Sequence, residues 1–128
     1  FHDNVCGHWL QFHHDTGKYT YENGRVHDNF ITAAYPEDMR GASISGVADD
    51  TVVYFYNNIV ANLGWFSGFN VYTGIAYVYN NTFYNIGGEG VVSVIDVHPE
   101  QYRHMYCKNN ILWSDGLEPY VYFGGSAG

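Results

Sequence analysis

The chain has 128 residues, which is enough for one domain with a core, and its 5 basic and 13 acidic residues give a net charge of −8. This balance argues against nucleic acid or an anionic membrane as a partner, because both need basic patches, and no apolar run approaches the ~20 residues of a membrane span. Only 14% of the residues are charged and 19% are aromatic, with 13 tyrosines and 15 glycines, which favours an all-β protein.

An asparagine-containing motif recurs along the chain. Its five copies are FHDNVC (1–6), VHDNFI (26–31), FYNNIV (55–60), VYNNTF (78–83) and CKNNIL (107–112). The shared asparagines are Asn4, Asn29, Asn58, Asn81 and Asn110. An apolar residue stands three places before each asparagine and another stands two places after it. Because asparagine is poor in strands and favoured in turns, the pattern predicts one such turn, between short strands, in every repeat.

A second strand-like run lies between the motifs, usually after a glycine. Its copies are HWLQFHH (8–14), ASISGV (42–47), FNVYTG (69–74), VVSVIDV (91–97) and YVYF (120–123). Several of them alternate with period two, as strands do. No segment shows heptads or a sustained helical period. The one helix-like stretch, residues 99–105, is short enough to be a loop.

A repeat of 23–29 residues made of short strands resembles the right-handed parallel β-helix, the pectin-lyase-like solenoid, with about five coils. The resemblance covers nearly the whole chain and is carried by motifs such as YFYNNIV and YVYNNTF. Stacked coils place equivalent residues ~4.8 Å apart. The asparagines are then expected to form a ladder in which each amide bonds to the next coil and to turn backbone. Five unrelated asparagine turns are the alternative.

One β-helix domain is expected over residues 1–128, and neither end of it resembles a cap. The chain starts at Phe1 rather than Met, within an asparagine motif, which predicts a processed chain or a fragment. Open solenoid ends expose apolar faces and strand edges, so we expect either further coils or end-to-end self-association. Cys6 and Cys107 lie four coil steps apart, too far for a disulfide, and are predicted to be free, mostly buried thiols.

Two histidine–aspartate pairs are candidate metal ligands. His2 with Asp3, and His27 with Asp28, occupy the same turn positions in the first two repeats. Stacking would bring two imidazoles and two carboxylates together, a ligand set that suits a divalent metal such as calcium. The alternative is a solvated turn in which aspartate replaces the asparagine of later repeats.

The segment IDVHPE (95–100) is the richest acid–base cluster. Asp96, His98 and Glu100 alternate, so a strand would place them on one face, and Arg103 follows closely. Two carboxylates ~5–10 Å apart would suit a glycosidase, whereas a base with a cation would suit a polysaccharide lyase. The alternative is a solvated exit from a strand. The paired-aspartate, Gly-His-Gly and arginine-rich signatures of the catalytic families are absent, so no catalytic residue is transferred from them.

Tyrosines form a candidate binding face. Tyr56 and Tyr79 share the motif position of His2 and His27, and three further tyrosines, at positions 54, 77 and 106, lie close by. Aromatic faces pack on sugar rings, so the stripe predicts glycan binding, with a protein interface or a purely stabilising stack as alternatives. His13, at the end of a strand-like run, is a further candidate site residue, because histidine can act as a base near neutral pH.

Two functions are therefore expected. One is a secreted or cell-surface carbohydrate-active protein of the lyase or hydrolase type. The other is a non-catalytic spike, fibre or adhesin segment that binds a glycan or assembles with itself. The negative net charge favours neutral glycans over uronic polymers, unless calcium bridges the charges.

Overall fold

The computed structural model describes residues 1–7, 10–13, 24–32, 41–45, 48, 50–63, 68–86, 95–97, 103–114 and 121–123. All regular structure in these residues is β-strand, so the predicted all-β class is confirmed. None of them forms a helix that could cross a lipid bilayer.

The described strands form three sheets. Sheet A contains β3 (Gly24–His27), β6 (Val52–Tyr56), β9 (Gly74–Tyr79) and β12 (Arg103–Lys108). Sheet B contains β1 (Val5–Cys6), β4 (Phe30–Thr32), β7 (Ile59–Leu63), β10 (Thr82–Ile86) and β13 (Ile111–Trp113). Sheet C contains β2 (Leu10–His13), β5 (Ala42–Ser45), β8 (Phe69–Val71), β11 (Ile95–Val97) and β14 (Val121–Phe123).

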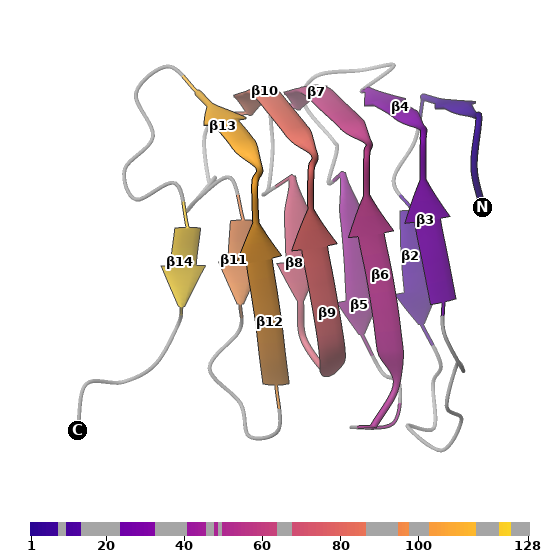
Figure 1. Cartoon of the computed structure of the whole chain (residues 1–128), viewed down its shortest axis with the longest axis vertical. Coiled ribbons are helices and arrows are strands. Elements are labelled where there is room, and N and C mark those ends of the chain that lie inside the picture. Colours follow the sequence, from indigo (N-terminus) through magenta and orange to yellow (C-terminus); the bar gives the residue numbers. More distant parts are fainter. Residues whose placement is uncertain are drawn as a thin grey trace.

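Every strand pairing in the three sheets is parallel, and each strand lies beside the strand three places later in the chain. Figure 1 shows the strands of sheet A in front, those of sheet C behind them and those of sheet B across the top. The chain thus visits sheets A, B and C in turn, and each such circuit is called a repeat. This topology brings equivalent residues of successive repeats into columns.

Alternation along the strands directs one face of each sheet into a shared core. On β6 and β9 every second residue is buried, including Phe55 and Val78. The Phe55 ring lies 4.8 Å from that of Phe69 in sheet C and 6.3 Å from that of Phe83 in sheet B, measured between ring centroids. Phenylalanines of all three sheets therefore meet in one apolar interior.

The asparagine column, defined as Asn4, Asn29, Asn58, Asn81 and Asn110, links the repeats between sheets A and B. The backbone N–H and Nδ2 of Asn58 donate to Oδ1 of Asn81 at 2.9 and 3.1 Å, and Oδ1 of Asn58 accepts the same two bonds from Asn29. The middle three members are at least 97% buried. Nδ2 of Asn58 also donates to the carbonyl oxygen of Val26 in the preceding repeat.

The residue before each member of the column turns the chain. Asp3, Asp28, Asn57, Asn80 and Asn109 all have φ between 53 and 56°. Aspartate and asparagine are the residues other than glycine that enter this left-handed region most readily. The recurring Asp-Asn or Asn-Asn pair therefore combines a corner residue with a residue that bonds to the neighbouring repeats.

Two local expectations were wrong. Residues 103–105, thought to be helix-like or a loop, lie in β12 and pair with Gly74–Ala76 of β9. Cys107 is free as predicted but exposed rather than buried. Its column partners Val26, Phe55 and Val78 are fully buried. Cys107 differs because no described strand pairs with the outer side of β12.

The asparagine column yields a stability prediction. Asn58→Ala should lower the free energy of unfolding by about 3 kcal/mol or more, because several buried donors and acceptors lose their partner at about 1–3 kcal/mol each. Denaturant unfolding followed by circular dichroism measures the loss. Asn62→Gly is the matched control, since Asn62 is exposed with φ of 58° and glycine keeps that conformation. Equal losses in the two variants would contradict the role given to the column.

Candidate functional site

The outer face of sheet A carries two rows of stacked rings. The histidine–tyrosine row consists of His2, His27, Tyr56 and Tyr79, with centroid distances of 5.0, 4.7 and 4.9 Å. The tyrosine row consists of Tyr54, Tyr77 and Tyr106, with distances of 5.1 and 4.8 Å. Neighbouring planes are within 15° of parallel in both rows. The rows arise because the in-register sheet puts the same motif position of each repeat side by side.

Cations flank both rows. The guanidinium carbon of Arg25 lies 6.0 Å from the centroid of the Tyr54 ring, within cation–π range. Lys108 pairs with Tyr79 in the sheet register and so ends the histidine–tyrosine row. Burial raises the pKa of the Tyr79 phenol, and the neighbouring Tyr56 adds to the effect. The hydroxyl of Tyr79 therefore stays protonated at neutral pH and can donate a hydrogen bond.

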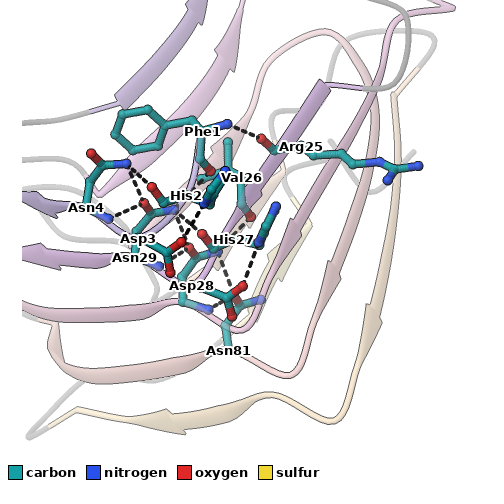
Figure 2. A network of polar contacts seen from close by, with 11 residues as sticks. Phe1, His2, Asp3, Asn4, Arg25, Val26, His27, Asp28, Asn29 and Asn81 are labelled. Carbon is teal, nitrogen blue, oxygen red and sulfur yellow. Dashed lines mark hydrogen bonds and ion pairs between the residues drawn. The ribbon is translucent and has the colours of Figure 1, made fainter.

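Figure 2 shows the two histidine–aspartate pairs at the start of the first row. Nδ1 of His27 donates to Oδ2 of Asp28 at 2.6 Å, and His2 bonds to Asp3 in the same way at 2.6 Å. The hydrogen bond from His27 holds the pKa of Asp28 below its ordinary value. Each carboxylate is thus held by the imidazole of its own repeat while the two imidazoles stack.

The four predicted metal ligands lie close together but are engaged in these pairs. Within the described part of the chain, no group of three or more histidine, cysteine, aspartate or glutamate side chains is arranged to hold a metal ion. The divalent-metal site at His2, Asp3, His27 and Asp28 stays a prediction.

The predicted acid–base cluster falls only partly on described residues. His98 and Glu100 lie outside them. The backbone places Asp96 on β11 in sheet C and Arg103 on β12 in sheet A, so the two belong to different sheets. His13 ends β2, at the edge of sheet C opposite to β14.

Asn70 is a buried polar residue that the sequence reasoning missed. It lies on β8, where the register pairs it with Asp96 of β11 and Ser43 of β5. Asn70 is only 1% exposed. Its Nδ2 donates to the Tyr72 hydroxyl at 3.4 Å, but its buried Oδ1 finds no hydrogen-bond partner among the described residues. A signal was present, because aligning the segments ASI, FNV and IDV puts Ser43, Asn70 and Asp96 at one position between apolar neighbours.

Comparison of the chain with protein-family models, with curated protein sequences and with solved structures finds no match in any of the three. The function is therefore argued from the geometry of the site.

The Cys107 thiol gives a prediction with a defined pH dependence. Although Cys107 is exposed, nearby groups desolvate its sulfur and raise the pKa of the thiol to about 11. Because the pKa is raised, the reactive thiolate forms only at higher pH. In a Cys6→Ser variant, the iodoacetamide alkylation rate should still be rising steeply at pH 10, whereas the same chain unfolded in urea should reach half its maximal rate near pH ~8.5 and level off about one unit higher. A plateau at the same pH in both states would contradict the desolvation.

Proposed function

We propose that the chain forms a right-handed parallel β-helix of about five coils, with the asparagine column as its amide ladder, and that it acts as a rigid, non-catalytic glycan-binding element. Residues 1–128 form one domain of it. The cyclic visits to sheets A, B and C and the bonds along the asparagine column support this architecture. A secreted or cell-surface location fits a glycan partner.

The observation that carries the proposal is the pair of ring rows on sheet A. Neighbouring centroids are 4.7–5.1 Å apart, whereas a sugar ring inserted between two aromatic faces needs about 7 Å, twice a van der Waals contact of about 3.5 Å. A glycan therefore cannot pack on ring faces within a row, as the sequence reasoning had supposed. It meets the ring edges, where half-buried tyrosines present phenol hydroxyls that donate and accept hydrogen bonds.

The rows also define the shape of the ligand. Hydroxyl groups repeat along the tyrosine row, and from Tyr56 to Tyr79 in the histidine–tyrosine row, at the spacing of parallel strands, ~4.8 Å. A linear polysaccharide lying along the stack would present its own hydroxyls in a similar repeating series. The net charge of −8 disfavours polyanions, so the ligand class is a neutral, extended polysaccharide.

Removing hydroxyls without removing rings tests this proposal. The triple variant Tyr56→Phe, Tyr77→Phe, Tyr79→Phe keeps both rows stacked and should bind a neutral linear glycan at least tenfold more weakly, since each lost hydrogen bond is worth about 1 kcal/mol. Isothermal titration calorimetry on a panel of soluble neutral glycans, with a polyuronate for comparison, measures the affinity.

The matched control is Tyr84→Phe, because Tyr84 stacks on Trp113 at 4.7 Å on sheet B, away from the proposed face. It should bind like the wild type. The proposal fails if the wild type binds none of the neutral glycans, or if the triple variant binds as tightly as the control. Lower stability without a change in affinity would identify the rows as a stabilising stack.

A second candidate, a lyase or hydrolase that uses Asp96, is favoured by one observation. The buried Oδ1 of Asn70, which has no hydrogen-bond partner in the part of the chain that the structure describes, belongs to the column that contains Asp96. A buried acceptor needs a donor, which a protonated carboxyl or a substrate hydroxyl would supply. Holding a proton on a carboxyl is what a general acid in glycoside cleavage requires.

Asp96→Asn tests the enzymatic candidate. On a polysaccharide panel assayed for reducing ends and unsaturated products, it should reduce turnover by about 10²–10⁴-fold, the usual contribution of a general acid or base. Tyr84→Phe, on sheet B and outside every candidate site, should retain activity. A wild type that releases no product from any neutral or uronic substrate would exclude this candidate in favour of the binding role.

A further inference from the structure

Side chains at the two ends of the stack are more exposed than the side chains at the same motif positions in its middle. In the column that Val5 begins on sheet B, Val5 is 79% and Ile111 64% exposed, against 47% for Ile59 between them. In the inward column of sheet A, Cys107 is exposed although Val78 is fully buried. Within the described residues, β1 and β13 are the open edges of sheet B.

The asparagine column leaves complementary groups at these ends. Each of its first four members donates its backbone N–H and Nδ2 to Oδ1 of the next member. Asn110 has no described asparagine beyond it, and its Nδ2 donates back to the carbonyl oxygen of Val78. At the opposite end, Oδ1 of Asn4 accepts from no described residue. One end therefore offers donors where the other offers an acceptor.

The backbone at the two ends is also complementary, in the opposite direction: the first repeat offers an N–H donor and the last repeat a carbonyl acceptor. The N–H of Ile59 donates to the Asn29 carbonyl oxygen at 2.9 Å, and the N–H of Ile111 donates to that of Asn81 at 2.9 Å. Val5 is the equivalent residue of the first repeat, and Asn110 carries the equivalent carbonyl of the last. Unpaired strand edges of this kind are templates for another chain.

We propose that a second copy of this chain docks end to end, its first repeat (Phe1–Cys6) covering β12 and β13 of the first copy. Asn110 then donates to Oδ1 of Asn4 in the next copy, and the Val5 N–H of that copy donates to the Asn110 carbonyl. Ile111 lies on Val5, and Cys107 lies on Phe1, which is 50% exposed in the single chain. This inference rests on the stacked repeats proposed above and not on glycan binding.

Charge selects the partner and its direction. Lys108 ends the column that His2 begins, so docking sets its ammonium over the His2–Asp3 pair of the next copy, where the Asp3 side chain is 74% exposed. Such an exposed ion pair contributes little affinity but favours one orientation. The opposite arrangement would set Lys108 against Lys108 and donors against donors. The contact is therefore head-to-tail, and because a straight stack does not close into a ring, it grows into a filament.

Blocking one end at a time tests the proposal on the 128-residue chain. Phe1→Lys blocks the first repeat and Cys107→Lys blocks the last, because docking would bury either ammonium in the inward column of sheet A. Both side chains are exposed in the single chain, so neither change disturbs the core. Sedimentation velocity should show wild-type assemblies that grow with concentration in the micromolar range, and monomers for each variant alone. A mixture of the two variants should form a dimer that grows no further, because the last repeat of Phe1→Lys still docks on the first repeat of Cys107→Lys.

Ile59→Lys is the matched control, since it adds the same charge to an exposed outer position in the middle of the stack and should assemble like the wild type. The triple Tyr→Phe variant should also assemble, which separates this proposal from the one on glycan binding. A monomeric wild type at micromolar concentration overturns the proposal. The proposal is also overturned if either single variant, shown to be folded by circular dichroism, still assembles. It is equally overturned if the mixture of the two variants stays monomeric.

Discussion

The three middle corners between sheets A and B each depend on one buried carboxamide, from Asn29, Asn58 or Asn81, that bonds to the repeats on both sides of it. At the corner the backbone leaves the sheets, so its polar groups need partners that the strand pairing does not supply. Asn58 illustrates the solution, because its Oδ1 accepts from Asn29 while its Nδ2 reaches both Asn81 and Val26. No apolar residue of similar size offers a donor and an acceptor together, which explains why asparagine recurs at this position.

The register that the asparagines fix at the corner also holds on the outer face of sheet A. Because the asparagines lock the repeats together, the positions next to them also align, and rings placed there have to stack. The resulting centroid distances lie in the range that aromatic pairs favour. The same alignment that stabilises the stack thus produces a regular series of polar ring edges. The rows of ring edges therefore have the same period as the repeats, and they follow from the alignment at the corner rather than from a loop.

The sequence predicted the features that depend on the spacing of motifs along the chain. It missed those that depend on which strand or side chain lies next to a residue. The Asn-Asn pairs, the apolar positions around them and the shared column of Tyr56 and Tyr79 could be read from the repeat, because a parallel stack converts equal spacing into adjacency. The exposure of Cys107 could not, since an inward position is buried only when another strand follows it. Whether the ring faces were free for a ligand could not be read from the sequence either, and the alternatives of a glycan-binding face and a stabilising stack were both left open; the spacing of the strands brings the rings into contact. Asn70 went unnoticed because one polar residue between apolar neighbours looks ordinary until its burial is known.

The uniform direction of the asparagine bonds gives the molecule an electrical axis. Oδ1 of Asn29, Asn58, Asn81 and Asn110 always accepts from the preceding repeat, so the side-chain carbonyls all point toward the first repeat. Aligned amide dipoles add, as peptide groups do along an α-helix. The column therefore behaves as a macrodipole made of side chains, negative toward the first repeat and positive toward the last. The backbone carbonyls of Asn29, Asn58 and Asn81 accept from the following repeat and point the other way, so at each corner the side-chain dipole opposes a peptide dipole of the same residue.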